Sequence, residues 1–136
     1  MKVLIVDDAD FKVENIIEYL SKLKIDYMVA ETYIEAIIKL KKYHKELAGA
    51  ILDLGFFFTE TQPGIGKDYS KYMGIQLAEE INEKYPNMPI LFNSDRQLLE
   101  EHKSEIIYFD HINPFYDNTE IITAFVECCR EYYSKK

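Results

Sequence analysis

Five short apolar segments alternate with segments of helical periodicity along this chain, and that alternation restricts the fold more than any other feature. The apolar segments lie at residues 3–6, 25–30, 48–53, 89–92 and 106–112. Their β-branched and aliphatic residues are typical of strands buried on both faces of a sheet. Alternation of strands and helices predicts right-handed crossovers, with helices on both faces of a parallel sheet. We therefore predict an α/β fold with one doubly wound five-stranded parallel sheet, in a single domain spanning residues 1–136.

The helical segments carry recognisable start signals. Helices are expected near residues 11–24, directly after Thr32, and near 71–85, 95–104 and 118–133. Asp10 is a candidate N-cap of the first helix, because a carboxylate can accept from free backbone N–H groups. Thr32 and Glu35 have the spacing of a capping box, and Ser94 and Gln97 repeat it.

Composition excludes several classes of function. The formal net charge of −8 disfavours direct binding to DNA or RNA, which normally needs a basic surface. No apolar run reaches the length of about 18 residues that a membrane span requires. The N-terminus enters a strand and then acidic residues, so it does not resemble a signal peptide. We expect a cytoplasmic protein that contacts neither nucleic acid nor membrane.

The two cysteines and three histidines show no metal-site pattern. Cys128 and Cys129 are neighbours in the last predicted helix, where side chains point about 100° apart and do not easily form a disulfide. We expect two reduced thiols, one in the core and one near the surface. The buried face of that helix is predicted to consist of Ile121, Phe125, Cys128 and Tyr132. The histidines, His44, His102 and His111, lack metal-ligand spacing and are expected to be surface or loop residues.

Acidic residues end two of the predicted strands. Asp7 and Asp8 follow the first strand, and Asp53 ends the third. In a flavodoxin-like strand order, 2-1-3-4-5, these two strands are neighbours, and ligands bind at the carboxyl ends of such strands. Three converging carboxylates repel one another, and carboxylate oxygens with water favour Mg²⁺ as the compensating ion. A carboxylate beside Mg²⁺ can also act as a nucleophile toward a phosphoryl group.

Four motifs in order resemble the receiver domain of two-component response regulators. The run at residues 4–8 resembles the first strand of that family with its acidic pair, and residues 51–53 resemble the strand that carries the phosphoacceptor aspartate. Ser94 matches the switch Ser/Thr at the end of the fourth strand. Asn113-Pro114-Phe115 stands where the family carries Lys-Pro-Phe. The resemblance spans the whole chain.

The resemblance implies a role for each matching residue. Asp7 and Asp8 would bind Mg²⁺ together with Asp53 and the backbone carbonyl of Gly55. Asp53 would accept a phosphoryl group from a histidine kinase or phosphotransfer protein. Ser94 would move to bond the phosphoryl oxygen. The chain would then be a stand-alone signalling domain rather than an enzyme, with output through a downstream protein target or a homodimer.

The sequence departs from the family at two positions, one in the predicted fifth strand and one directly after it. Asn113 replaces the lysine, and an amide cannot neutralise a phosphoryl charge. The position of the switch aromatic falls near Asp110, with Tyr108 and Phe109 just before it.

The loop at residues 54–70 is the third departure, because it is longer than the usual turn. Lys67 in this loop is a candidate substitute for the missing lysine. The three phenylalanines, Phe56 to Phe58, are expected to anchor the loop in the core or to form a lid or partner surface.

Alternative functions remain at this point. A pseudo-receiver that binds a protein partner without phosphorylation is favoured by Asn113. An aspartate-nucleophile phosphatase is suggested by Asp8-x-Asp10, although Lys12 stands where that family has Thr or Val. An FMN-binding flavodoxin is disfavoured, because the acids after the first strand would repel phosphate. The segment at residues 64–68 resembles a P-loop only in part, since it lacks the first glycine and the Ser/Thr after the lysine.

Overall fold

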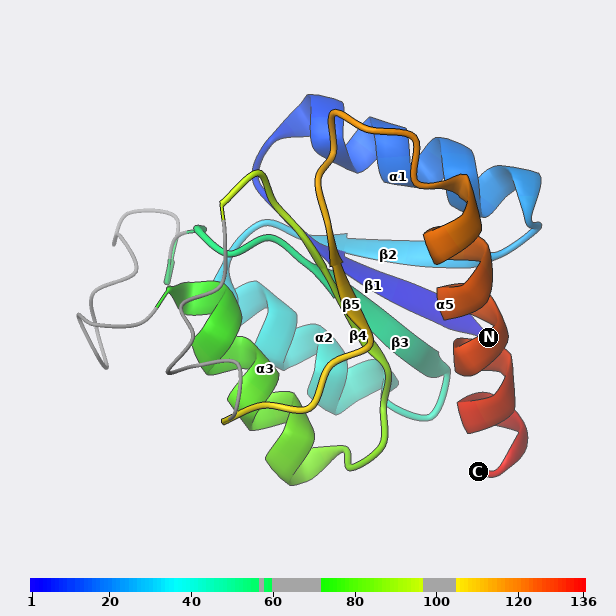
Figure 1. Ribbon diagram of the computed structural model, residues 1–136. Helices are drawn as coiled ribbons and strands as arrows, with labels where there is room; N and C mark the ends of the chain where they lie inside the picture. Colours follow the sequence, from blue (N-terminus) through cyan, green and yellow to red (C-terminus); the bar gives the residue numbers. More distant parts are fainter. Residues whose placement is uncertain (57, 60–71, 97–104) are drawn as a thin grey trace.

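A parallel sheet forms the centre of the molecule (Figure 1). The computed structural model describes residues 1–56, 58–59, 72–96 and 105–136. The sheet has five strands in the order β2-β1-β3-β4-β5. The strands are β1 (Lys2–Val6), β2 (Asp26–Ala30), β3 (Leu47–Leu52), β4 (Ile90–Asn93) and β5 (Asp110–Ile112). The predicted fold class and strand order are confirmed.

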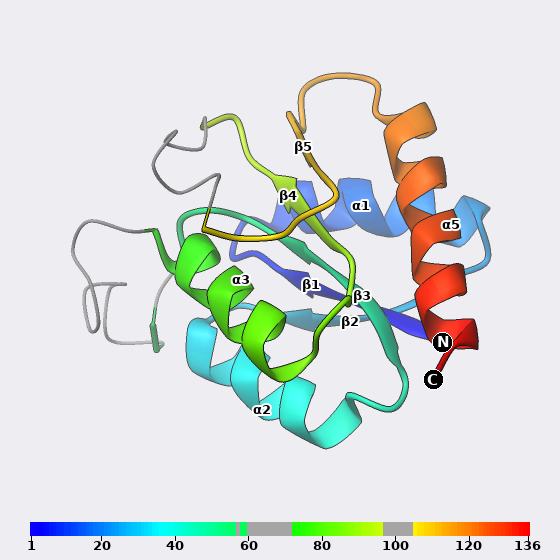
Figure 2. The ribbon, with the colours of Figure 1, turned by 60° about the horizontal axis from the view of Figure 1, so that its bottom comes forward.

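Helices cover both faces of the sheet. The helices within the described residues are α1 (Asp10–Lys22), α2 (Tyr33–Tyr43), α3 (Met73–Lys84) and α5 (Thr119–Ser134). Helices α1 and α5 lie on one face, and α2 and α3 lie on the other (Figures 1 and 2). Of the helix predicted near residues 95–104, all but the first two positions fall outside the described residues. None of the described helices combines the length and apolar character that a membrane span requires.

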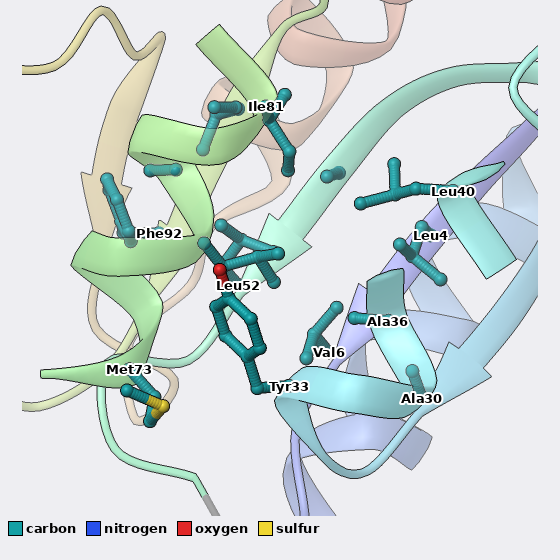
Figure 3. Close-up of a cluster of buried hydrophobic side chains, with 14 of the residues drawn as sticks. Leu4, Val6, Ala30, Tyr33, Ala36, Leu40, Leu52, Met73, Ile81 and Phe92 are labelled. Atoms are coloured by element: carbon teal, nitrogen blue, oxygen red, sulfur yellow. The ribbon is translucent and has the colours of Figure 1, made fainter. Parts of the chain in front are cut away.

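Strand residues alternate between two apolar layers. Leu4, Val6 and Leu52 pack with α2 and α3 in one layer (Figure 3). Ile5 and Ile51 pack in the other layer, with residues of α1 and α5. Because side chains alternate along a strand, the residues after Val6 and Leu52 point toward the α1 and α5 side. This alternation places the side chains of the site described below.

The N-termini of two helices test the predicted caps. Helix α1 begins at Asp10 with Ala9 as N-cap and no side-chain cap bond, so the prediction that Asp10 caps the helix is wrong. Instead, Asp7 Oδ1 accepts from the Ala9 N–H at 2.9 Å. At α2 the Thr32 half of the capping box is confirmed, because Thr32 Oγ1 accepts from the Glu35 N–H at 3.2 Å. The Glu35 carboxylate accepts from the backbone N–H of Glu31, the residue before the N-cap, at 3.0 Å.

Helix α5 buries a face one position away from the predicted one. Its buried residues are Ile122, Phe125, Val126 and Cys129. Phe125 belongs to both faces, but Cys129 rather than Cys128 lies in the core, where it is fully buried. Apolar residues occur in adjacent pairs along this helix, so helical spacing alone did not decide which member of each pair faces the sheet. The expectation of one core thiol and one nearer the surface is confirmed.

Strand β5 is shorter than predicted. It covers Asp110–Ile112, whereas the sequence suggested a strand from residue 106. Before β5, Ile107 bonds to the side-chain amide of Asn82 and not to β4. Its N–H donates to Asn82 Oδ1 at 2.7 Å, and its carbonyl accepts from Asn82 Nδ2 at 3.0 Å. A side-chain amide thus takes the place of a strand partner here.

Candidate functional site

Three carboxylates meet at the carboxyl ends of β1 and β3. The ligand oxygens of Asp7, Asp8 and Asp53 all lie within 4.8 Å of one another. Asp7 and Asp53 each extend the hydrogen bonding of their strand by one residue. The Asp7 N–H donates to the Ala30 carbonyl at 3.0 Å, and the Asp53 N–H donates to the Val6 carbonyl at 2.9 Å. Asp7 and Asp53 are buried and Asp8 is exposed, so the predicted cluster forms with Asp8 at its solvent-facing side. We refer to the cluster of these three carboxylates as the pocket.

Lys12 enters this pocket from α1. Its Nζ lies 2.8 Å from Asp53 Oδ1 and 3.0 Å from Asp7 Oδ2. Only 11% of its side chain is exposed, and a lysine so buried normally requires paired partners. Lys12 was not among the residues predicted to form this site. Its place two residues into a helix that directly follows the acidic pair was the available signal.

The charges in the pocket shift the proton affinities of its members. Burial, with the nearby charge of Asp53, raises the pKa of Asp7 to about 6, although the Ala9 N–H and Lys12 oppose that rise. For Lys12, burial alone would lower the pKa. The hydrogen bonds and charges of Asp53 and Asp7 outweigh burial and raise it. Lys12 is therefore held as an ammonium.

Two glycines near Asp53 allow close contacts that a side chain would obstruct. A Cβ built on Gly74, at the start of α3, would lie 2.1 Å from the Asp53 carbonyl oxygen. The Gly74 N–H donates to the Leu54 carbonyl at 2.9 Å, which holds α3 against this segment. A Cβ on Gly55 would lie 2.6 Å from Nη1 of Arg96, so a second cation lies close to the backbone two residues after Asp53. Neither Gly74 nor Arg96 was assigned to the site from the sequence.

Ser94 lies at the end of β4 with its hydroxyl group buried. Its Oγ accepts from the Arg96 N–H at 3.1 Å, and its N–H donates to the Ile112 carbonyl at 3.0 Å. His111 Nε2 lies 3.0 Å from the Ser94 carbonyl oxygen. The expectation that His111 is an ordinary surface or loop residue is therefore wrong, because its ring links β5 to this end of β4. Ser94 is thereby connected to β5 through both its N–H and its carbonyl group.

Asn93 precedes Ser94 and is also buried. The register between β3 and β4 pairs Leu52 with Phe92, so one further step places Asn93 beside Asp53. Within the described part of the chain, Asn93 Oδ1 is buried without a hydrogen-bond partner. This polar atom lies on the strand next to the carboxylates.

The side chain of Asn113 is engaged outside the pocket. Its Oδ1 accepts from the Phe115 N–H at 2.9 Å, and its carbonyl accepts from Asn118 Nδ2 at 2.8 Å. These bonds hold the turn between β5 and α5. Lys67, the predicted substitute for the missing lysine, lies outside the described residues.

The residues near the expected position of the switch aromatic, 108–110, are all described. Asp110 is the first residue of β5 and is exposed, and its Oδ1 accepts from the His111 N–H. Tyr108 packs edge-on against Phe92, and Phe109 packs against Phe125. The two aromatic side chains before β5 are thus engaged in packing.

Two of the three phenylalanines after Asp53 are described, and both anchor the chain. Phe56 is 4% exposed in the core, and Phe58 stacks on Tyr33 with a ring separation of 5.4 Å. Phe57 and most of the loop at residues 54–70 lie outside the described residues.

The donor set fits a hard dication. Carboxylate oxygens are the ligands that Mg²⁺ prefers. Asp8 faces solvent, and no hydrogen bond or ion pair to Asp53 Oδ2 is present among the residues that the structure describes. Asp8 is thus the solvent-facing carboxylate of the cluster, and Asp53 Oδ2 lies beside the ammonium of Lys12. Asp10, the second residue of the phosphatase-like pattern, is exposed at the start of α1 and is not part of the cluster.

Comparison with known proteins gives structural matches only. No protein-family profile and no curated protein matches the sequence. The chain is similar to the N-terminal domain of a response regulator/sensory box/GGDEF 3-domain protein from Carboxydothermus hydrogenoformans. That pair shares 20% identity with a TM-score of 0.73, covering 99% of this chain and 98% of that one.

Two further structures give the same result. The signal receiver domain of an HD domain-containing protein from Pseudomonas fluorescens Pf-5 is 16% identical, with a TM-score of 0.73 over 98% of this chain and 90% of that one. A CheY-like response regulator receiver domain from Methanospirillum hungatei JF-1 is 17% identical, with a TM-score of 0.73 over 99% and 98%. Strand order, helix placement and these matches agree, and the chain has the fold of the response regulator receiver domains.

Proposed function

We propose that this protein is a receiver-like signalling domain that accepts a phosphoryl group on Asp53. The convergence of Asp7, Asp8 and Asp53 within 4.8 Å, at the strand ends where this fold binds ligands, is the observation that carries the proposal. The proposed donor is a histidine kinase or phosphotransfer protein, and the output is contact with a downstream protein. Both cysteines are free thiols, which suits the cytoplasm.

Asp53 is the nucleophile in this proposal. One oxygen of its carboxylate forms a bond to phosphorus while the bond between phosphorus and the donor's leaving atom breaks. The electron pair of that bond departs with the leaving group, and Asp53 becomes an acyl phosphate. Asp53 suits this role because its Oδ1 is fixed by Lys12 while Oδ2 has no ion pair among the described atoms.

Asp7, Asp8, Asp53 and the backbone carbonyl of Gly55 would hold Mg²⁺. When bound, Mg²⁺ would offset the negative charge of the incoming phosphoryl group. The acidic residues present each contribute hard oxygen donors, and Asp8 is exposed at the open side of the pocket.

Ser94 would transmit the modification. Its buried hydroxyl is bonded to the Arg96 N–H, and its backbone is bonded to β5 through Ile112 and His111. A hydroxyl that leaves the Arg96 N–H for a phosphoryl oxygen would alter β4 and β5 together. The surface near β5 and α5 is then the proposed output face.

A phosphorylation-independent pseudo-receiver is the second candidate. The observation that favours it is Asn113, whose side chain bonds to the Phe115 N–H and brings no cation to the pocket. In that case the carboxylates and Lys12 would only stabilise the fold. The partner protein would bind the unphosphorylated domain.

Labelling with a small phosphodonor separates these functions. The protein is incubated with Mg²⁺ and acetyl phosphate, and intact-mass spectrometry measures the addition of one phosphoryl group. Asp53→Asn is the matched variant, because it keeps the side-chain size and removes the nucleophile. We expect labelling of the wild-type protein, loss of label with hydroxylamine, and no label on Asp53→Asn.

The other outcomes contradict the proposal in distinct ways. Absence of labelling under any Mg²⁺ concentration, with no Mg²⁺ binding by calorimetry, supports the pseudo-receiver. Continuous turnover of a phosphate ester supports an aspartate-nucleophile phosphatase. Labelling that persists in Asp53→Asn would assign the phosphoacceptor to another residue.

A further inference from the structure

We propose that Lys12 on α1 binds the phosphoryl group on Asp53, in place of the lysine that Asn113 replaces. This inference rests on the proposed phosphoacceptor role of Asp53. It assigns to the first helix a function that the resemblance to response regulators places at the end of the fifth strand.

The position of the Lys12 ammonium group supports this role. Its Nζ contacts Asp53 Oδ1 at 2.8 Å and Asp7 Oδ2 at 3.0 Å. An ammonium carries three hydrogen-bond donors on a flexible stem. It can therefore keep one bond to Asp7 while a second donor turns to a phosphoryl oxygen attached to Asp53.

The charge balance of the pocket also favours this role. Among the described residues, Lys12 is the ammonium that pairs with Asp7 and Asp53. A phosphoryl group adds further negative charge in a partly buried site, where an uncompensated anion is costly. Lys12 already contacts one oxygen of the carboxylate that would carry this added charge.

Asn113 is not able to share this task. Its Oδ1 accepts from the Phe115 N–H, and its carbonyl accepts from Asn118 Nδ2 and from the Tyr116 N–H at 3.2 Å. These bonds hold it in the turn after β5. In this proposal the ammonium therefore comes from α1, the helix that follows β1, and not from the residue that follows β5.

This placement changes which surface senses the phosphoryl group. Lys12 follows Phe11, which is 57% exposed and stacks on Phe115 with a ring separation of 6.0 Å. A movement of Lys12 toward a phosphoryl group would act on the start of α1 and, through this aromatic pair, on the turn after β5.

Beryllofluoride binding tests the proposal without requiring a phosphodonor. Beryllofluoride with Mg²⁺ is titrated into the wild-type protein and the Lys12→Met, Lys12→Met/Asn113→Lys and Lys22→Met variants, and binding is followed by ¹⁹F NMR. Loss of a charge-assisted bond should weaken binding about ten- to a hundredfold in Lys12→Met. Asn113→Lys in the same chain should restore much of the affinity. Lys22→Met is the matched control, because Lys22 is an exposed lysine in the last turn of the same helix.

A second readout uses the wild-type protein and so does not depend on the folding of Lys12→Met. The ¹³Cε signal of Lys12 is assigned by comparison with Lys12→Arg and followed during the titration. We expect this signal to shift on binding, together with amide signals at the start of α1.

The outcomes distinguish this proposal from the one on which it rests. Wild-type binding of beryllofluoride with equal binding by Lys12→Met, or with an unmoved Lys12 signal, overturns the role of Lys12 and leaves the function of Asp53 intact. Failure of the wild-type protein to bind beryllofluoride overturns both proposals. Lower thermal stability of Lys12→Met with unchanged affinity assigns Lys12 a purely structural role.

Discussion

Gly74 packs directly against the carbonyl oxygen of Asp53, so closely that a Cβ at position 74 would lie 2.1 Å from that oxygen and 2.9 Å from the Leu54 Cα. Both contacts are backbone atoms, which have little freedom to yield. The start of α3 therefore fixes the position of the proposed nucleophile.

Replacing Gly74 by alanine should damage both stability and the site. Overpacking against backbone costs about 1–3 kcal/mol, which exceeds the gain of about 1 kcal/mol from the higher helix propensity of alanine. We expect a lower midpoint in urea unfolding and slower phosphorylation of Asp53. Glu83→Ala, at an exposed position of the same helix, is the control. A Gly74→Ala variant as stable as the wild type would show that α3 shifts freely away from Asp53.

Replacing Ser94 by alanine should uncouple β5 from the site. The substitution removes the acceptor of the Arg96 N–H bond, which we expect to cost about 1 kcal/mol. The larger effect is expected in amide NMR spectra, where beryllofluoride should move the signals of β5 less than in the wild type. Ser134→Ala, which removes an exposed hydroxyl in α5, should leave that response intact. An undiminished response in Ser94→Ala would exclude Ser94 as the switch.

Removing the charge of Lys12 should also destabilise the fold. Lys12→Met leaves two buried carboxylates without their partner, and breaking a buried ion pair costs about 3 kcal/mol. Urea unfolding with and without Mg²⁺ measures the effect. We expect Mg²⁺ to recover part of the loss, because the ion stabilises only the folded protein. Equal unfolding midpoints for variant and wild type would contradict the ion pairs.

The capping box of α2 predicts a pH-dependent contribution. Burial alone would raise the pKa of Glu35, but the bonds from Lys39 and from the Glu31 N–H outweigh it, and the pKa is lowered. A lowered pKa in the folded state gives stability that is present above the unfolded value near 4.5 and is lost as pH falls through the folded value. Because Glu35 is 40% exposed, the expected cost of Glu35→Gln at neutral pH is small, about 0.5 kcal/mol.

Urea unfolding of wild type and Glu35→Gln at pH 7 and pH 3 measures this contribution. The difference between the two proteins should shrink at pH 3. Thr32→Ala, which removes the uncharged half of the box, should cost about 1 kcal/mol at both pH values. A Glu35→Gln effect that grows as pH falls would have the wrong sign for this carboxylate.

The spacing of apolar residues along the chain was sufficient to predict the parallel sheet and the helices that cover its two faces. Strand-period and helix-period segments depend on local side-chain alternation, which tertiary contacts rarely reverse over such lengths. The convergence of Asp7, Asp8 and Asp53 followed from the strand order, because neighbouring parallel strands end at the same edge. The acidic pocket was therefore predictable from the positions of three aspartates at strand ends and from the order of the strands.

Other features depended on orientations that periodicity does not encode. The choice between Cys128 and Cys129 for the core needed the rotation of α5 against the sheet. The start of β5 depended on Asn82, a residue distant in sequence that binds Ile107. The turn bonds of Asn113 likewise required the positions of Phe115 and Asn118.

The sequence by itself determined where the acids are, and only the tertiary structure decided which cation meets them. Asp7, Asp8 and Asp53 lie at strand ends, where pairing and period fix their place. Lys12 reaches Asp53 through the angle at which α1 packs on the sheet, a relation between two elements that no single segment specifies. Lys12, which departs from the motif of the aspartate-nucleophile phosphatases, thereby provides the ammonium of the pocket.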